Sequence, residues 1–318
     1  MEKDNKPTVV VSRCLGFSNC RYNGDIINDK FVEMLKEYVN YITVCPEVDI
    51  GLGVPRNALR LTLEKEKVDL YQPASNEVFT KEIEDYSTSF FQSLDEVHGF
   101  ILKGRSPSCG IKDVRVYLGK EKAVGSVKGV GIFASKVIDS YPYLAIEEEG
   151  RLTNYFLREH FLTKLFTLFR FQLVSDSNSM KELVKFHSEN KYLFLSYNQS
   201  ELKILGKIVA NHDNRLLKDL VNDYRDHLGL LLAKPPRKGN YMNSFMHIFG
   251  YFSEYLRKEE KDFILERFDK YNNDKIHIGV ITNLLKSYAI RYEKEYILNQ
   301  SIFSTYPEEL HYISDSGK

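Results

Sequence analysis

Three of the four cysteines in this chain stand shortly behind runs of β-forming residues. Cys14 follows VVVS, Cys45 follows YITV, and Cys109 follows GFIL after a short loop. In an open α/β sheet the ends of parallel strands meet at one edge, so side chains far apart in the sequence converge there. We therefore expect a fold that brings these strand ends together. After Cys109 the chain contains no further cysteine.

Residues 7–137 alternate between β-rich runs and stretches with apolar residues at helical spacing. Helices are predicted over 29–38 and 81–94. The alternation is typical of an α/β domain with a Rossmann-like, open, doubly wound parallel sheet. The predicted strands are Thr8–Ser12, Tyr41–Val44, Leu59–Leu63 and Gly99–Leu102, with a further candidate at Ala123–Val127.

The second half of the chain has a different pattern. Residues 141–150 (YPYLAIEEEG) combine a proline, an acidic triplet and a glycine, which is typical of a connector. A long amphipathic helix is predicted over 151–173, and helical periodicity continues to the end, with breaks at 211–214, 234–240 and 271–274. We predict an α/β domain over 1–150, a helical connector over 151–174 and an all-α domain over 175–318.

Length and charge narrow the class of protein. A chain of 318 residues is long enough for about two domains. Lysine and arginine number 44, as do aspartate and glutamate, so the chain has no signal for a strongly basic DNA-binding protein. Neither a secretory signal nor an apolar run long enough to cross a bilayer is visible. We expect a cytoplasmic protein, and in that compartment clustered cysteines favour metal binding or catalysis over disulfides.

The cysteine pattern indicates a metal or iron–sulfur site. A thiolate at Cys14 or Cys20, in the loop after the first strand, would be stabilised by loop amides and by Arg13 and Arg21. The spacing differs from that of a zinc ribbon, and neighbouring histidines are missing. Ordinary buried cysteines remain the alternative for any single pair.

Two further motifs add groups that can move protons or bind a ligand. Glu47 stands two residues behind Cys45, and a carboxylate beside a buried cluster can transfer a proton. A solvated Glu that caps a helix is the alternative. Residues 103–110 (KGRSPSCG) place two hydroxyls, two cations and a thiol in a loop whose glycines permit close approach of a ligand.

Other motifs are less specific. Residues 129–134 (GVGIFA) match the GxGxxA pattern of dinucleotide-binding sites. The acidic residue that follows the next strand in such sites is missing. A glycine turn that begins a helix is the favoured interpretation, with its amides free for an anion as a further option. The histidines of the second half are interpreted as packed or surface residues. Its basic loop is interpreted as solvated, with a phosphate backbone contact as the alternative; it contains Lys234, Arg237 and Lys238.

Taken together, the motifs resemble those of the thiouracil desulfurase family. In the first half they are SRCLG, CRYNG, CPE, GLGVPR, KGRSPSCG, KGVGIFA, EEEGRL and REHF. In the second half KFHSENK, LGKIVA, the run from Asn243 to Phe252, and Gln300 with YPEEL are similar to the helical domain that follows in long members of the family. Small departures are Asn23, where Asp is commoner, and His160, where Asn often stands.

The resemblance implies a [4Fe–4S] cluster held by three cysteines, with one iron open to the substrate's sulfur. Carried over by motif, the ligands would be Cys14, Cys45 and Cys109, while the role of Cys20 stays undecided. The motif carboxylate is Glu47 and the motif serine is Ser106, with Ser108 as the alternative. The implied substrate is a thiolated pyrimidine, either a free thiouracil-type base or thiouridine in tRNA.

Three functions follow as hypotheses. The first is a desulfidase that replaces the sulfur of a thiolated pyrimidine by oxygen from water and releases hydrosulfide. The second is a non-catalytic RNA-binding or regulatory protein whose cluster is structural or sensing. The third is a thiol redox enzyme in which Cys14 and Cys20 form a disulfide pair.

Overall fold

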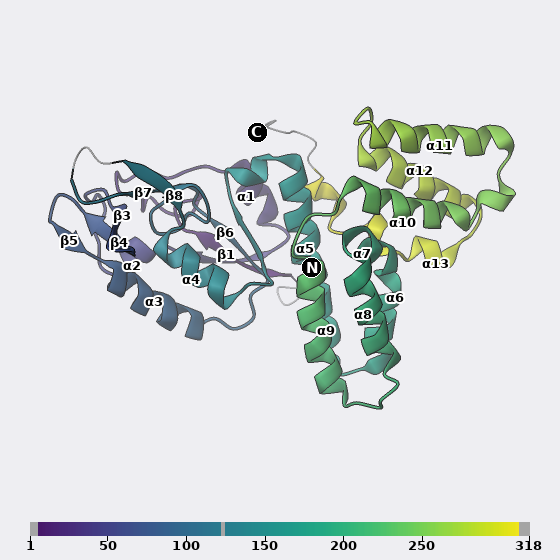
Figure 1. Ribbon diagram of the computed structural model, residues 1–318, viewed down its shortest axis with the longest axis horizontal. Coiled ribbons are helices and arrows are strands. Elements are labelled where there is room, and N and C mark those ends of the chain that lie inside the picture. Colours follow the sequence, from purple (N-terminus) through teal and green to yellow (C-terminus); the bar gives the residue numbers. More distant parts are fainter. Residues whose placement is uncertain (1–5, 122–124, 312–318) are drawn as a thin grey trace. The chain divides into compact units, whose positions relative to one another are not determined.

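The computed structural model describes residues 6–121 and 125–311. The chain divides into two compact units, one of residues 1–165 with 309–318 and one of residues 166–308. The first is α/β and the second is helical, which confirms the predicted fold class (Figure 1). Helix α5 (Tyr155–Asp176) contains the boundary between the units, at residues 165 and 166, and overlaps most of the predicted connector 151–174. The predicted domain limits themselves stay a prediction.

A four-stranded parallel sheet forms the centre of the first unit. Its strand order is β2-β1-β6-β9, and every neighbouring pair is parallel. Its strands are β1 (Thr8–Ser12), β2 (Asn40–Val44), β6 (Gly99–Leu102) and β9 (Ala145–Glu148). Three of the predicted strands are thus confirmed. The register pairs Ser12 with Val44 and Leu102 with Glu148, so the strands end together at one edge.

The predicted strand Leu59–Leu63 was wrongly assigned to the parallel sheet. It forms β3 of a second, mixed sheet of order β5-β4-β3-β7-β8, and β3 pairs antiparallel with β4. The connecting residues Lys65 and Glu66 both have positive φ, a hairpin geometry that Asn-Gly usually signals. Residues 64–67 (EKEK) contain neither Asn nor Gly, so the sequence does not indicate this turn. The strands are β3 (Arg60–Glu64), β4 (Lys67–Gln72), β5 (Glu77–Val78), β7 (Val114–Tyr117) and β8 (Ser126–Gly129).

Two other expectations need correction or cannot be judged. The interpretation of 141–150 as a connector is wrong for residues 145–148, which form β9 of the parallel sheet. Its acidic residues disguised the strand, because three adjacent carboxylates are atypical of a buried strand. Of the candidate run Ala123–Val127, residues 123 and 124 lie outside the described residues, and its end overlaps β8.

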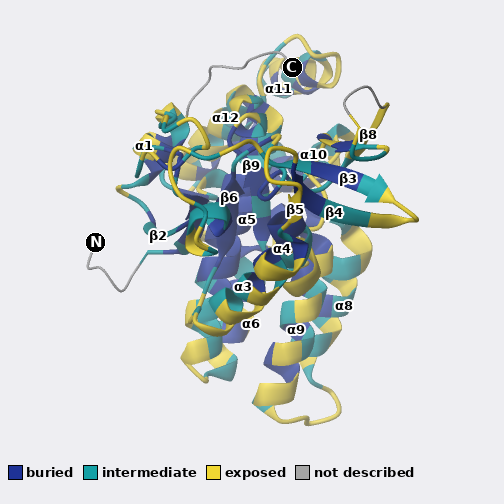
Figure 2. Ribbon diagram, turned by 90° about the vertical axis from the view of Figure 1, so that its left-hand side faces the viewer, coloured by how far each residue is buried: buried dark blue, intermediate teal, exposed yellow. Residues whose placement is uncertain are grey.

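Helices cover the sheets of the first unit and fix where the strand ends lie. They are α1 (Lys30–Leu35), α2 (Pro46–Asp49), α3 (Thr80–Gln92), α4 (Ile132–Ser140) and the 3₁₀ turn η1 (Arg151–Thr153). Both helices predicted in this region are found, the first shortened to one and a half turns. Phe90 and Phe91 of α3 pack on Phe133 of α4, with ring centroids 6.1 and 5.7 Å apart. Figure 2 shows exposed residues on the outer faces of α3 and α4.

The second unit is built from helices, as predicted. Phe171, Phe186 and Tyr224 form part of its core, and the hydroxyl of Tyr224 lies 3.1 Å from Nδ1 of His187. Asn211 has a positive φ and ends α8 at the predicted break. The α-helices are α6 (Met180–Glu189), α7 (Lys191–Tyr197), α8 (Gln199–Ala210), α9 (Leu217–Leu231), α10 (Lys238–Gly250), α11 (Lys258–Asn272), α12 (Ile278–Arg291) and α13 (Glu295–Leu298).

Short 3₁₀ turns complete the chain at η2 (Ser253–Tyr255), η3 (Ser301–Phe303) and η4 (Glu308–Leu310). Among the described residues, no helix combines the length and the apolar composition that a bilayer crossing requires.

Candidate active site

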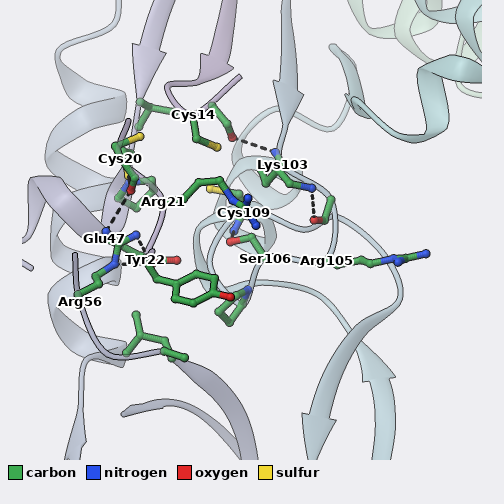
Figure 3. Close-up of a pocket in the computed structure, with 18 residues that line it drawn as sticks. Cys14, Cys20, Arg21, Tyr22, Glu47, Arg56, Lys103, Arg105, Ser106 and Cys109 are labelled. Carbon is green, nitrogen blue, oxygen red and sulfur yellow. Dashed lines mark hydrogen bonds and ion pairs between the residues drawn. The ribbon is translucent and has the colours of Figure 1, made fainter. Parts of the chain in front are cut away.

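The loops that follow β1, β2 and β6 surround one cavity of about 450 Å³ (Figure 3). All four cysteines line it, although up to 95 residues separate them in the sequence. All four are free thiols: Cys45 is half-buried and the other three are buried. The edge of the parallel sheet therefore assembles a thiol-lined cavity from three separate loops. The cysteines are Cys14, Cys20, Cys45 and Cys109.

Three of the thiols lie side by side. The Cys20 thiol hydrogen bonds with those of Cys14 and Cys45. Hydrogen bonding to Cys14, assisted by burial, raises the pKa of Cys20 to about 11. Hydrogen bonding to Cys20, together with burial, likewise raises the pKa of Cys45. In addition, the Cys45 thiol donates to the carbonyl of Cys20 over 3.8 Å. Without a bound cation, the raised pKa values of Cys20 and Cys45 favour the protonated form of these two thiols.

Cys109 approaches the cavity from another loop. Its side chain is 6 % exposed, and burial raises the pKa of its thiol. The side chains of Ser12 and Ser106 hydrogen bond with this thiol and act against that rise. Ser106 Oγ also accepts the backbone N–H groups of Ser108 and Cys109 at 3.2 and 3.1 Å. Ser106 therefore both lines the cavity and shapes the turn that carries Cys109.

Glu47 is held by a buried arginine and by a serine. Arg56 donates from Nε and Nη2 to Glu47 Oε2, at 2.9 and 2.6 Å, and the Arg56 side chain is 6 % exposed. Ser108 Oγ donates to Glu47 Oε1 at 2.9 Å. Arg56 Nη1 also donates to the Cys20 carbonyl at 3.0 Å. Glu47 thus faces the cavity with a fixed orientation and a balanced charge.

The two candidate serines differ in position. Ser106 lines the cavity, whereas Ser108 is fully buried and reaches Glu47. The sequence did not single out Arg56 for a role, although it lies in the quoted GLGVPR motif, nine residues after the carboxylate that it binds. A buried carboxylate is stabilised when a cation pairs with it. The presence of an arginine in the motif that follows Glu47 could therefore have identified Arg56.

Asp49 links the first two cysteine loops. Its carboxylate accepts the backbone N–H of Cys45 at 3.2 Å and the hydroxyl of Tyr86 at 2.7 Å. It also pairs with Arg13 at 2.9 Å. Arg13 was expected to stabilise a thiolate; its nearest carboxylate partner is instead Asp49. Arg21 lines the cavity, and its Nη1 lies 3.7 Å from Asp25.

The glycine motif of residues 129–134 supports the Cys109 loop. At the start of α4, the amides of Gly131, Ile132 and Ala134 donate to the carbonyls of Gly110, Pro107 and Ser108 at 2.8, 3.1 and 3.0 Å. A Cβ at position 131 would lie 2.5 Å from the Ser108 carbonyl oxygen. The favoured glycine turn is confirmed, and these amides bind the loop rather than an anion.

Tyr22 and Arg105 stand at the open side of the cavity. The Tyr22 side chain is 46 % exposed and lines the cavity, and Figure 3 shows its ring extending towards Ser106. Arg105 has a φ of +61°, and its side chain points away from the cysteines (Figure 3). The sequence did not single out Tyr22, although it lies in the quoted CRYNG motif. An aromatic next to a candidate ligand could have identified it.

The donor set suits a thiophilic group larger than one ion. Within residues 6–121 and 125–311, no group of three or more His, Cys, Asp or Glu side chains has the arrangement to hold a single metal ion. Four free thiols instead line a cavity of about 450 Å³, and the described histidines do not line it. An iron–sulfur cluster is bound by thiolates, each on a different iron, so the donors need not converge on one point. The residues present therefore fit an iron–sulfur cluster.

The fold and this cavity define an α/β domain with a strand-end thiol site. Residues 9–149 match the family described as 2-thiouracil desulfurase, and residues 191–307 match a family of proteins of unknown function, DUF1722. The resemblance to the thiouracil desulfurase family is thereby confirmed for the α/β part of the chain. A helical domain of a second family follows it.

Two individual proteins are similar to parts of the chain. The uncharacterised protein YbgA of Escherichia coli (strain K12) is 28 % identical over 149 residues, which cover 44 % of this chain and 88 % of that protein. A solved structure, the [4Fe–4S]-dependent thiouracil desulfidase TudS, is 23 % identical with a TM-score of 0.36. That match covers 46 % of this chain and 93 % of the other.

Proposed function

We propose that this protein is a cytoplasmic desulfidase that removes sulfur from thiolated pyrimidines. Water replaces the thiocarbonyl sulfur by oxygen, and the sulfur leaves as hydrosulfide, so no electron donor or acceptor is needed. One observation carries the proposal. Within a segment that matches the 2-thiouracil desulfurase family, four free thiols and an oriented carboxylate surround one cavity.

Cys14, Cys45 and Cys109 would hold a [4Fe–4S] cluster. They come from three different loops, which suits three irons of one cluster and leaves a fourth without a protein thiolate in this set. When bound, the cluster supplies a Lewis-acidic iron for the thiocarbonyl sulfur. Cys20 hydrogen bonds with two of the three proposed ligands, so we assign it a supporting contact to their sulfurs rather than a fourth bond to iron.

Glu47 is the proposed base. Arg56 occupies one carboxylate oxygen through two hydrogen bonds, and Ser108 binds the other, which fixes the plane of the carboxylate. A water bound at Oε1 would lose its proton to Glu47 as the oxygen attacks the pyrimidine carbon. The same carboxyl group would then return that proton to the sulfur, which leaves as hydrosulfide, and would take the remaining hydroxyl proton as the new carbonyl forms, releasing it to solvent. Burial of Arg56 keeps this arrangement in place while the proton is transferred.

Ser106 is the proposed hydroxyl of the site. Its oxygen accepts two backbone N–H groups, so its O–H is the group that can donate, either to the Cys109 sulfur or to a bound molecule. It would orient the substrate or the water from the wall of the cavity. Ser108 would act through Glu47, because it is fully buried and its hydroxyl binds that carboxylate.

The substrate is either a free base or thiouridine within tRNA. Under the second option, the helical unit would position the polynucleotide. The basic loop of Lys234, Arg237 and Lys238 is the candidate for a phosphate contact. Within it, Lys238 pairs with Asp274, so this ammonium group is already bound by a carboxylate. We therefore leave the helical unit without an assigned surface.

Anaerobic purification with iron reconstitution tests the proposal. The reconstituted protein is incubated with 2-thiouracil and, separately, with thiolated tRNA, while iron content, visible absorption and released sulfide are measured. A cluster with sulfide release is the expected result, and the faster substrate identifies the natural class. A cluster without sulfide from either substrate would favour a sensing or RNA-binding protein and overturn the desulfidase.

A further inference from the structure

The loop of residues 103–113 carries Ser106, Ser108 and Cys109, and it leaves the parallel sheet at the end of β6. The register of the sheet pairs Leu102, the last residue before the loop, with Glu148 of β9. The next amide, that of Glu149, donates to the Leu102 carbonyl at 3.3 Å. The end of β9 therefore lies beside the start of the loop.

Glu149 binds the first residues of the loop 103–113. Its Oε2 accepts the backbone N–H of Gly104 at 2.7 Å, and its Oε1 accepts Nζ of Lys103 at 2.5 Å. The residue is 9 % exposed. Hydrogen bonds to a buried carboxylate are stronger than neutral ones, so this contact fixes the first turn of the loop.

Glu148 binds the other end of the same loop. Its Oε1 accepts the backbone N–H groups of Ile111 and Lys112 at 2.7 and 3.2 Å, and the residue is 6 % exposed. A Cβ at Gly104 would lie 2.9 Å from Glu148 Oε2, so the glycine makes room for this carboxylate. Two adjacent carboxylates thus hold both ends of the segment that contains Cys109.

We propose that Glu148 and Glu149 are positioning residues for Cys109 and Ser106. By binding positions 103–104 and 111–112, they leave the six residues in between little freedom, so the Cys109 thiol stays buried and directed at the cavity. Outer contacts of this kind orient the groups that bind a cofactor. The consequence for cluster binding rests on the proposed function, whereas the effect on the loop itself does not.

The chain supplies a matched control in Glu147. This residue is 9 % exposed and lies on the same strand. Its carboxylate pairs with Arg151 at 2.6 Å and accepts the amide of Glu148, and its hydrogen bonds do not include the loop 103–113. Substituting Glu147 therefore removes a comparable buried charge next to Glu148 and Glu149, the pair here called the clamp. It does so without removing a hydrogen bond to the loop.

The test measures the loop in the cluster-free protein. Alkylation of each cysteine by iodoacetamide is followed by peptide mass spectrometry, with amide hydrogen exchange of residues 104–112 and the thermal unfolding midpoint recorded in parallel. We expect Glu148→Ala and Glu149→Ala to speed alkylation of Cys109 about tenfold or more, because each loses at least one charged hydrogen bond. Cys14 in the same samples should react at its usual rate.

Conservative variants separate positioning from simple destabilisation. Glu148→Gln and Glu149→Gln keep a carbonyl acceptor, so protection of the loop amides should largely return. Glu147→Ala should change Cys109 alkylation less than twofold. Unchanged Cys109 reactivity in both alanine variants, or an equal increase in Glu147→Ala, would overturn the proposal. Should the alanine variants fail to fold, amide exchange in Glu148→Asp and Glu149→Asp decides, because the shorter side chain withdraws the carboxylate from the loop amides. Faster exchange at 104 or 111–112 supports the clamp, and unchanged exchange in both variants overturns it.

Iron reconstitution of the same variants distinguishes this proposal from the desulfidase proposal. Loss of loop protection in the alanine variants, together with a wild type that takes up a cluster but releases no sulfide, would support the clamp and contradict the desulfidase. Normal sulfide release by clamp variants with unprotected loops would support the desulfidase and contradict the need for positioning.

Discussion

Two of the loops that carry cysteines into the cavity are held in very different ways. The Cys109 loop is bound by buried carboxylates at the end of β9, by the hydroxyl of Ser106 and by amides at the start of α4. The loop from Cys14 to Gly24 relies mainly on backbone hydrogen bonds, both internal and to Ile27 and Arg56, while the Arg56 side chain and the Cys45 thiol donate to the Cys20 carbonyl. It also exposes Tyr22. The comparison indicates one closely held wall of the cavity, here called the rigid wall, and one more exposed wall, here called the open wall.

The largest effect is expected where the two walls are linked. Glu47 binds Ser108 of the rigid loop and, through Arg56, the Cys20 carbonyl of the open loop. Glu47→Gln keeps the shape but loses the base, so kcat should fall about 10²–10⁴-fold. Iron content should remain that of the wild type. Steady-state sulfide release measures this, and a variant with full activity would remove Glu47 from the chemistry.

The two serines of the rigid loop should differ. Ser106→Ala removes a hydroxyl on the cavity wall and the acceptor of two amides, so activity should fall about 10²-fold. Ser108→Ala removes one hydrogen bond to a carboxylate that Arg56 still holds, for a loss of about tenfold. Parallel kinetics of the two variants decide between the candidates. The reverse order would make Ser108 the catalytic hydroxyl.

Rigidity of the Cys109 wall can be tested at Gly131. Gly131→Ala would place a Cβ 2.5 Å from the Ser108 carbonyl oxygen, a backbone atom that cannot move aside alone. We expect a loss of about 2–3 kcal/mol in the free energy of unfolding, together with poorer cluster loading. Gly239→Ala in α10 is the control. There a Cβ meets nothing within 4 Å and a helical alanine stabilises by up to about 1 kcal/mol. Equal unfolding midpoints for both variants would contradict a tightly packed wall.

The smallest effect is expected at the open wall. If the substrate's ring stacks on Tyr22, Tyr22→Ala should raise KM about tenfold and leave kcat nearly unchanged, whereas Tyr22→Phe should retain the wild-type KM. Kinetics over a range of 2-thiouracil concentrations separate the two parameters. A fall in kcat at constant KM would show that this loop, too, shapes the reacting geometry.

The sequence predicted the convergence of Cys14, Cys45 and Cys109 because each of these three follows a strand whose apolar run is easy to detect. It failed where polar residues conceal structure. The hairpin at Lys65 and Glu66 has no Asn or Gly to mark it, and the strand ending in Glu147 and Glu148 looks like a solvated connector until its partners are known. Contacts between distant residues, such as Arg56 with Glu47, depend on the tertiary fold and leave little trace in local pattern.

The most direct test of the central claim is iron and sulfide measured together in five proteins. These are the wild type, Cys14→Ser, Cys45→Ser, Cys109→Ser and Cys20→Ser, each reconstituted anaerobically and supplied with a thiolated pyrimidine. We predict that the first three substitutions each abolish both the cluster absorption and sulfide release, and that Cys20→Ser retains cluster iron. A wild type that takes up no cluster, or a Cys109→Ser protein with full iron and full sulfide release, would contradict the proposed site.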